Sequence, residues 1–338
     1  MTKAACAESS SMNSPVTPPS LSPEENSQES LAPGAPLSHQ TTHSPVEKSF
    51  PEQIFLGPDG LRLGWRILVY IGAFRAILYA LIWLGQSFFP ESVSGVALLW
   101  QYMYGEAAFV IAAISPAFLM GNIEGRSVDE YGLPRKQAFG KLFWIGALWG
   151  LFSIAALLVG LRVVGVFNFG HIALHGARIW KFALFWGVFF VLVGLFEEFL
   201  FRGYLLFTMR RGLGFWPAAG ILSCAFGAIH LSNGGEGFVG ALSAAFIGLF
   251  FCLTLQRTGT LWFAVGFHAL WDWGQTYVGG VADSGTVEPG HLLSPSFHGP
   301  PWLTGGSVGP EGSLLCFLLV LVIGAVFARR YPQVKYKG

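Results

Sequence analysis

The chain has 338 residues, of which 53% are hydrophobic and 12% are charged, and its formal net charge is +1. Because an average soluble domain is about 25% charged, this composition is typical of a polytopic membrane protein. The near-zero net charge offers no basic surface, so we expect no nucleic-acid partner. The four cysteines include no CxxC pair, which argues against a thiolate metal site and a disulfide framework.

The first part of the chain has a different composition from the rest. Residues 1–55 are rich in Ser, Pro, Thr, Gln and Glu and contain no apolar stretch of the kind a signal peptide needs. Such a segment buries too little apolar surface to offset its chain entropy. We therefore expect a disordered N-terminal tail over 1–55 and a membrane-embedded helical domain over 56–338.

Apolar runs follow one another through this second part. A helix needs roughly 20 apolar residues to cross the hydrocarbon core of a bilayer. The predicted fold class is therefore all-α, a polytopic transmembrane helix bundle with about eight spans. These spans are expected near 64–86, 96–120, 141–163, 180–205, 214–231, 238–256, 261–279 and 313–329.

Lysine and arginine residues are concentrated in alternate connections between the runs. They are Arg62, Arg66, Arg126, Arg135, Lys136, Lys141, Arg210, Arg211, Arg257, Arg329, Arg330, Lys335 and Lys337. The intervening loops 87–95, 232–237 and 281–306 contain neither residue type, and only Arg178 in loop 164–179 dilutes the pattern. By the positive-inside rule, we expect a multi-pass protein of the plasma membrane with both termini in the cytoplasm.

Two polar residues lie alone in the first two runs. Arg75 falls in the first predicted span and Glu106 in the second. A single intramembrane ionisable residue of this kind often packs against a partner or extends to the interface. We expect one of these roles for each residue, or an ion pair between them.

Three charges interrupt the fourth run, in "EEFLFR". On insertion scales each such charge at a helix centre costs about 2.5–3.5 kcal/mol, so each needs a partner or a function. Glu198 and Arg202 are spaced i,i+4 with the glutamate first, which favours an ion pair on one helix face. Glu197 points about 100° away around the helix, so it is directed at another group.

Later spans supply candidates for that group. His230 ends the fifth span, and His268 with Asp272 lies at i,i+4 on the seventh. In one chemistry, Glu197 is a general base for water and the histidines assist or stabilise an oxyanion. In another, His230 and His268 bind zinc or another divalent ion together with Glu197 or Asp272. A proton or ion relay in a transporter would use the same residue types.

The order of three motifs resembles a known family. "EEFLFR" (197–202), "FGAIH" (226–230) and "HALWD" (268–272) are similar to the EExxxR, FxxxH and HxxxN/D motifs of the CPBP, or Abi, intramembrane proteases. This family includes the type II CAAX prenyl endopeptidase, and the resemblance covers roughly residues 120–280. It implies hydrolysis of a peptide or protein substrate, which could be prenylated, within the lipid bilayer.

The resemblance also implies a role for each matching residue. Glu197 would be the catalytic base, and His230 would assist the water or bind metal. His268 and Asp272 would stabilise the oxyanion or complete a metal site, which leaves metal dependence open. The remaining motif positions, Glu198, Arg202 and Phe226, would have orienting or structural roles. An ionised Asp272 only accepts hydrogen bonds, unlike the Asn of other members, so a direct oxyanion role would require its protonation.

One geometric difficulty follows from the predicted spans. A fourth span ending near 205 places Glu197 close to the cytoplasmic face, which suits a cytoplasmic substrate. His230 then lies at the far end of its own span. We therefore expect staggered, broken or re-entrant helices that line a cavity. The rival functions are a proton- or ion-coupled transporter and a non-catalytic membrane scaffold of the same fold.

Overall fold

The computed structural model describes residues 49–58, 60–89 and 95–336. The disorder predicted for the tail falls mostly on residues 1–48, outside the described part. Residues at the end of that predicted tail form a short helix, α1 (Phe50–Phe55), followed by a small hairpin of β1 (Leu56–Gly57) and β2 (Gly60–Leu61). The tail therefore does not extend to residue 55.

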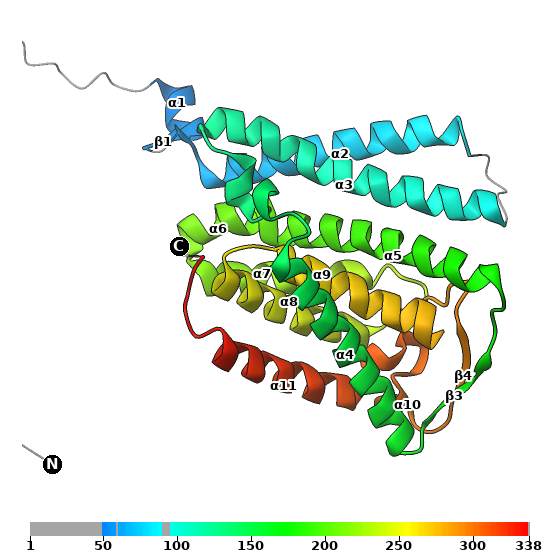
Figure 1. Cartoon of the computed structure of the whole chain (residues 1–338). Helices are drawn as coiled ribbons and strands as arrows, with labels where there is room; N and C mark the ends of the chain where they lie inside the picture. The colour runs from blue at the N-terminus through cyan, green and yellow to red at the C-terminus, as the bar shows by residue number, and fades with distance from the viewer. Residues whose placement is uncertain (1–48, 59, 90–94, 337–338) are drawn as a thin grey trace, which may run out of the picture. The chain divides into compact units, whose positions relative to one another are not determined.

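Eight helical segments alternate in direction within the described chain, as Figure 1 shows. They are α2 (Leu63–Gln86), α3 (Val96–Glu124), α4 (Lys141–Val163), α5 (Ala177–Glu198) continued by η3 (Phe199–Tyr204) and α6 (Leu205–Leu213), α7 (Phe215–His230), α8 (Phe238–Thr258), α9 (Trp262–Asp272) continued by η4 (Trp273–Gly279), and α11 (Leu314–Arg330). The predicted all-α bundle is confirmed.

Length and composition qualify five helical stretches of the described chain as membrane spans. They are Leu63–Gln86, Ala97–Glu124, Lys141–Val163, Ala177–Leu213 and Phe238–Thr258. The other three predicted spans are shorter helices, with 16 residues in α7, 11 in α9 followed by 7 in η4, and 17 in α11. Large apolar side chains such as Trp83, Phe152 and Trp180 are exposed on the bundle surface. A lipid environment explains this exposure, because it removes the penalty for apolar surface outside the core.

The remaining elements lie in the connections. The short turns η1 (Val128–Tyr131) and η2 (Arg135–Gln137) join α3 to α4. After α4, strand β3 (Phe167–Ile172) pairs antiparallel with β4 (Leu293–Phe297), with a register irregularity between Asn168 and His171. The loop before α11 holds three short helical turns, which are α10 (Pro301–Thr304), η5 (Gly306–Val308) and η6 (Pro310–Gly312).

The bundle has two distinct ends. The basic end holds the start of α2, the ends of α3, α6, α8 and α11, and most of the lysines and arginines. Trp262 Nε1 donates to the Pro134 carbonyl there (3.1 Å). The strand end holds β3, β4 and the loops 231–237 and 280–312. Asn233 Nδ2 donates to the Ser284 carbonyl at that end (3.2 Å), which joins the two loops.

The fourth segment differs from its prediction. A span of 180–205 was expected, but the helix continues through η3 and α6 to Leu213. The chain turns at Gly214, whose φ of +83° lies in a region that favours glycine. Glu197 and His230 lie about 26 Å and about 24 Å from this turn along their helices, at a rise of about 1.5 Å per residue. An antiparallel hairpin therefore brings both to the same depth without re-entrant helices. Glu197 lies near the middle of the stretch Ala177–Leu213 and not close to the basic end.

Glycines bring α4 and α9 into close contact. An added Cβ at Gly146 would lie 2.0 Å from the carbonyl oxygen of Phe263, and at Gly150 it would lie 2.1 Å from that of Phe267. In the opposite direction, a Cβ at Gly266 would lie 2.1 Å from the Phe143 carbonyl oxygen. Small residues at such a crossing let helix backbones approach closely. This crossing fixes the position of α9.

We expect Gly150→Ala to destabilise the protein and to reduce its activity. The added methyl group would push α9 away from α4 at a cost of about 1–3 kcal/mol, typical of an overpacked interface. Gly160→Ala on the same helix is the matched control, because its nearest atom, Leu315 Cδ1, lies 4.0 Å away. Thermal unfolding in detergent measures the difference. Equal unfolding midpoints for the two variants would contradict the role of this crossing.

Candidate active site

A buried ion pair forms the inner wall of the site. Arg202 Nη1 donates to Glu198 Oε1 (3.2 Å), and neither side chain is exposed. The i,i+4 pair predicted from the sequence is confirmed. The Arg202 guanidinium also lies over the Phe226 ring, 4.2 Å from its centroid. Gly248 on α8 leaves room for it, because a Cβ at that position would lie 2.3 Å from Arg202 Nη2.

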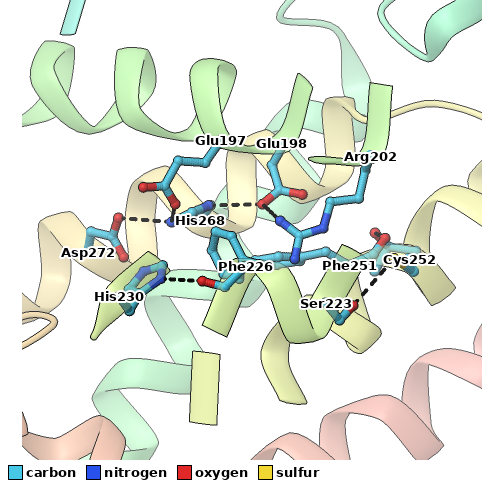
Figure 2. A network of polar contacts seen from close by, with 11 residues as sticks. Glu197, Glu198, Arg202, Ser223, Phe226, His230, Phe251, Cys252, His268 and Asp272 are labelled. Carbon is cyan, nitrogen blue, oxygen red and sulfur yellow. Dashed lines mark hydrogen bonds and ion pairs between the residues drawn. The ribbon is translucent and has the colours of Figure 1, made fainter. Parts of the chain in front are cut away.

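His268 joins three carboxylates, as Figure 2 shows. Its Nδ1 lies 3.1 Å from Glu198 Oε1. Its Nε2 lies 3.3 Å from Asp272 Oδ2 and 3.6 Å from Glu197 Oε2. The ring stacks on Phe251, with the centroids 5.4 Å apart. Since carboxylates face both ring nitrogens, they favour an imidazolium that donates from each nitrogen.

Both glutamates therefore reach the same imidazole from opposite sides. The sequence predicted that Glu197 would be directed at a group other than Arg202, and His268 is that group. The sequence did not predict that Glu198 would contact His268 as well as Arg202. The ion pair consequently holds the histidine ring in place.

Two π-helical segments flank the carboxylates. The segment η3 begins immediately after Glu198, and η4 begins immediately after Asp272. Within η3, Gly203 has non-helical backbone angles (φ −81°, ψ −112°). Such wide turns inside helices occur frequently at functional sites, where they change the direction of nearby side chains. Their positions here are consistent with a functional role for both acidic residues.

His230 has a defined hydrogen-bonding state. Its Nδ1 lies 2.7 Å from the carbonyl oxygen of Phe226, one turn earlier on α7. A carbonyl oxygen can only accept, so Nδ1 carries the proton and Nε2 of the neutral ring is left as an acceptor. His230 can therefore accept a hydrogen bond from a water molecule.

A cavity of about 220 Å³ connects these groups. All four residues predicted to be catalytic line it: Glu197, His230, His268 and Asp272. Phe226 also lines the cavity, whereas Glu198 and Arg202 lie behind the wall. The side chains of Glu197 and His268 are 17% and 12% exposed, so the cavity leaves both accessible.

The structure adds acidic residues that the sequence did not assign to the site. Glu106 on α3 lines the cavity, although we expected it to pack singly or to pair with Arg75. Arg75 instead lies at the surface over the Tyr79 ring, 5.7 Å from its centroid. A glutamate in an apolar run was the available signal for Glu106. No sequence signal separated the loop residues Glu236 and Glu311 from ordinary solvated acids.

The sequence left a metal site open as one alternative. Among the described residues, His230, His268 and a carboxylate do not bring their ligand atoms within 4.8 Å of one another. The group that does so consists of Asp272, Asp283 and Glu311. Its oxygen donors suit hard cations better than zinc. In this geometry the side chains of His230, His268 and a carboxylate do not converge on one shared ion, and we derive no catalytic step through a metal.

One loop carboxyl near the site has a raised pKa. Burial, together with the negative charge of Glu311, raises the pKa of Glu236 from 4.5 to about 7. Glu236 lies in the loop between α7 and α8 and lines the cavity. Because the folded protein holds this proton more tightly than the unfolded chain does, the residue adds to stability at low pH.

The raised pKa predicts how Glu236 changes the stability of the folded protein with pH. The contribution of Glu236 to stability is fully present below pH 4.5 and is lost as the pH rises to about 7. We therefore expect Glu236→Gln to reduce the fall in unfolding midpoint between pH 4.5 and 7. Parallel curves for wild type and Glu236→Gln would contradict the prediction.

The fold and the site together define a class of protein. It is a membrane-embedded helical bundle whose carboxylates and imidazoles surround an internal cavity, an arrangement suited to acid–base chemistry on a substrate.

Comparison with known proteins gives one family. Residues 179–274 match the model described as type II CAAX prenyl endopeptidase Rce1-like. The match covers less than a third of the chain, from α5 to the start of η4, and contains all three motifs. It confirms the resemblance seen in the sequence and identifies this segment as related to a family of membrane proteases. No curated protein and no solved structure matches the chain.

Proposed function

We propose that this protein is an intramembrane endopeptidase in which Glu197 activates a water molecule. One observation carries the proposal. The Glu197 carboxylate lines the cavity, is accessible, and lies 3.6 Å from His268 Nε2, inside the segment that matches a protease family. A carboxylate placed in this way can act as a general base on a bound water.

The proposed hydrolysis uses three residues that line the cavity: Glu197, His230 and His268. Glu197 takes a proton from water while the water oxygen forms a bond to the substrate carbonyl carbon. His230 accepts a hydrogen bond from this water through Nε2. The carbonyl oxygen becomes an oxyanion, which the Nε2–H of the His268 imidazolium stabilises. Glu197 then gives the proton to the leaving nitrogen as the C–N bond breaks, and the products are an amine and a carboxylic acid that ionises in water.

The other polar groups position these three. Asp272 accepts from His268 Nε2 at rest and orients the ring, a role that needs no protonation of the aspartate. Glu198 fixes the opposite edge of the ring through Nδ1. Arg202 compensates the charge of Glu198, and both side chains are fully buried. Phe226 supports both the Arg202 guanidinium and, through its carbonyl, His230.

The name of the matched family supplies the first substrate to test, a prenylated CAAX peptide. The experiment incubates purified protein in detergent with a fluorogenic prenylated peptide and compares wild type with Glu197→Ala. We expect wild type alone to cleave. Cleavage by both proteins would refute the role of Glu197. If neither cleaves, a wider peptide library separates a wrong substrate from an absent activity.

A chelator distinguishes the two hydrolytic chemistries. In the metal alternative, His230 and His268 would hold zinc or another divalent ion with Glu197 or Asp272. The separation of their ligand atoms supports the glutamate route instead. We therefore expect o-phenanthroline to leave wild-type cleavage unchanged, and a loss that added zinc restores would favour the metal route.

Two other functions use the same residues. A proton- or ion-coupled carrier would transport a solute across vesicles without cleaving peptides. A scaffold of the same fold would do neither. The match to a protease family and the shared cavity of all four predicted catalytic residues favour the protease.

A further inference from the structure

The cavity extends from the catalytic residues toward one end of the bundle. At its inner limit, Glu198 and Arg202 are completely buried. In the other direction, the lining passes along α8 through Ile247 to Gly240 and reaches Thr286, which is exposed. The cavity therefore opens beside the loops that follow α7 and η4.

These loops belong to the strand end. Trp186 Nε1 on α5 donates to the Pro289 carbonyl (3.2 Å), and Ser243 Oγ on α8 donates to the Glu311 carbonyl (2.8 Å). In Figure 1, β3 and β4 lie at this end, and the C-terminal end of the chain lies at the opposite one. The described residues thus place the mouth away from the basic end.

Positive charge separates the two ends. The basic end carries Arg62, Arg66, Arg126, Arg135, Lys136, Lys141, Arg210, Arg211, Arg257, Arg329, Arg330 and Lys335. The strand end carries Arg162, Arg178 and Lys181, and its loops 231–237 and 280–312 contain no lysine or arginine. An excess of lysine and arginine marks the cytoplasmic side of a membrane protein. The cavity mouth is therefore assigned to the other side.

We infer that the catalytic cavity opens on the non-cytoplasmic face of the membrane, and that its substrate is a peptide segment presented on that side. This inference rests on the proposed protease function and restricts its substrate. A prenylated CAAX terminus in the cytoplasm would face the closed end of the bundle. The corrected length of the fourth segment matters here, since it places Glu197 near the middle of Ala177–Leu213 and not at the basic end.

The chemistry of the mouth agrees with this restriction. Its described lining includes the acidic residues Glu236, Asp283, Glu288 and Glu311 and no lysine or arginine. A substrate that must insert a free C-terminal carboxylate would meet like charge without a cationic partner. An internal peptide bond carries no such charge and avoids this repulsion.

Cysteine labelling in intact cells tests the orientation independently of activity. Thr286→Cys places a thiol at the mouth, and Gln137→Cys places a matched, exposed thiol at the basic end. Both variants also carry Cys6→Ser and Cys224→Ser, while Cys252 and Cys316 remain because they are buried. The reagent is a membrane-impermeant maleimide applied to spheroplasts before and after permeabilisation.

We expect Thr286→Cys to be labelled fully in intact spheroplasts and Gln137→Cys to be labelled only after permeabilisation. The reverse pattern would overturn the inference. Complete labelling in detergent serves as the folding control, and Val287→Cys, also exposed, replaces Thr286→Cys if that variant fails it.

Cleavage in detergent has no sidedness, so it separates this inference from the proposed function. Cleavage in detergent together with reversed labelling would refute the orientation and retain the protease. The expected labelling without any cleavage would retain the orientation but refute the protease and the substrate class inferred from it.

Discussion

Replacing Glu197 with glutamine should lower the rate of peptide cleavage by about 10²–10⁴-fold, the usual contribution of a general base. The amide is nearly the same size as the carboxylate but cannot take a proton from water. Loss of the Glu197 carboxylate leaves the ion pair of Glu198 and Arg202 intact, so the fold should be retained. Initial rates on a cleavable peptide, with unfolding midpoints measured in parallel, test both statements.

The matched control is Glu130→Gln, which removes a carboxylate at the basic end whose side chain is 45% exposed. We expect it to retain the wild-type rate. If Glu197→Gln cleaves within a few-fold of wild type, Glu197 is not the base. If it loses activity only because it unfolds early, the experiment must be repeated below its unfolding midpoint.

Replacing Arg202 with methionine should produce the largest loss of stability. This change leaves Glu198 buried and without its cation, and breaking a buried ion pair in this way typically costs about 3–5 kcal/mol. It also leaves the space beside Gly248 and Phe226 partly empty. The thermal unfolding midpoint in detergent should fall clearly below that of wild type.

The double variant Glu198→Gln/Arg202→Met distinguishes charge from packing. Without the carboxylate, the lost arginine no longer leaves a buried charge, and we expect much of the stability to return. Activity should stay low in the double variant, because a glutamine at position 198 accepts from His268 without its charge. Equal destabilisation in the single and double variants would contradict the account of Arg202 as the partner of Glu198.

The sequence predicted the polar centre more accurately than its surroundings. The i,i+4 spacing of Glu198 with Arg202, and of His268 with Asp272, follows from helix geometry alone. Each pair indeed forms within a continuous helix, at 3.2 Å and 3.3 Å respectively. Contacts between helices were less accessible, because spacing along one helix does not specify what faces it from another.

The length of the fourth helical segment was not predicted correctly from the sequence. The fourth span was expected to end near 205, before Arg210 and Arg211. In the structure the charges of "EEFLFR" are compensated internally, and the apolar helix continues to Leu213, beyond Arg210 and Arg211. The π-helical turns of η3 and η4 have no clear sequence signature, so the local change of direction could not be predicted.

The outer part of the site was not predicted for a different reason. Asp283 and Glu311 lie in a long loop rich in glycine and proline, where acidic residues are usually solvated. Packing of this loop over α8 and η4 brings them to the cavity. Glu106 was visible as an isolated intramembrane glutamate, but only the packing of α3 against α5 shows that it faces Glu197's cavity.

Hydrolysis in H₂¹⁸O tests the central claim most directly. Purified wild type and Glu197→Gln are incubated in detergent with a peptide library in H₂¹⁸O, and the products are analysed by mass spectrometry. Activated water predicts that wild type alone generates new C-terminal carboxylates, each carrying one ¹⁸O atom. Equal amounts of labelled product from both proteins, or no labelled product from wild type, would contradict the account.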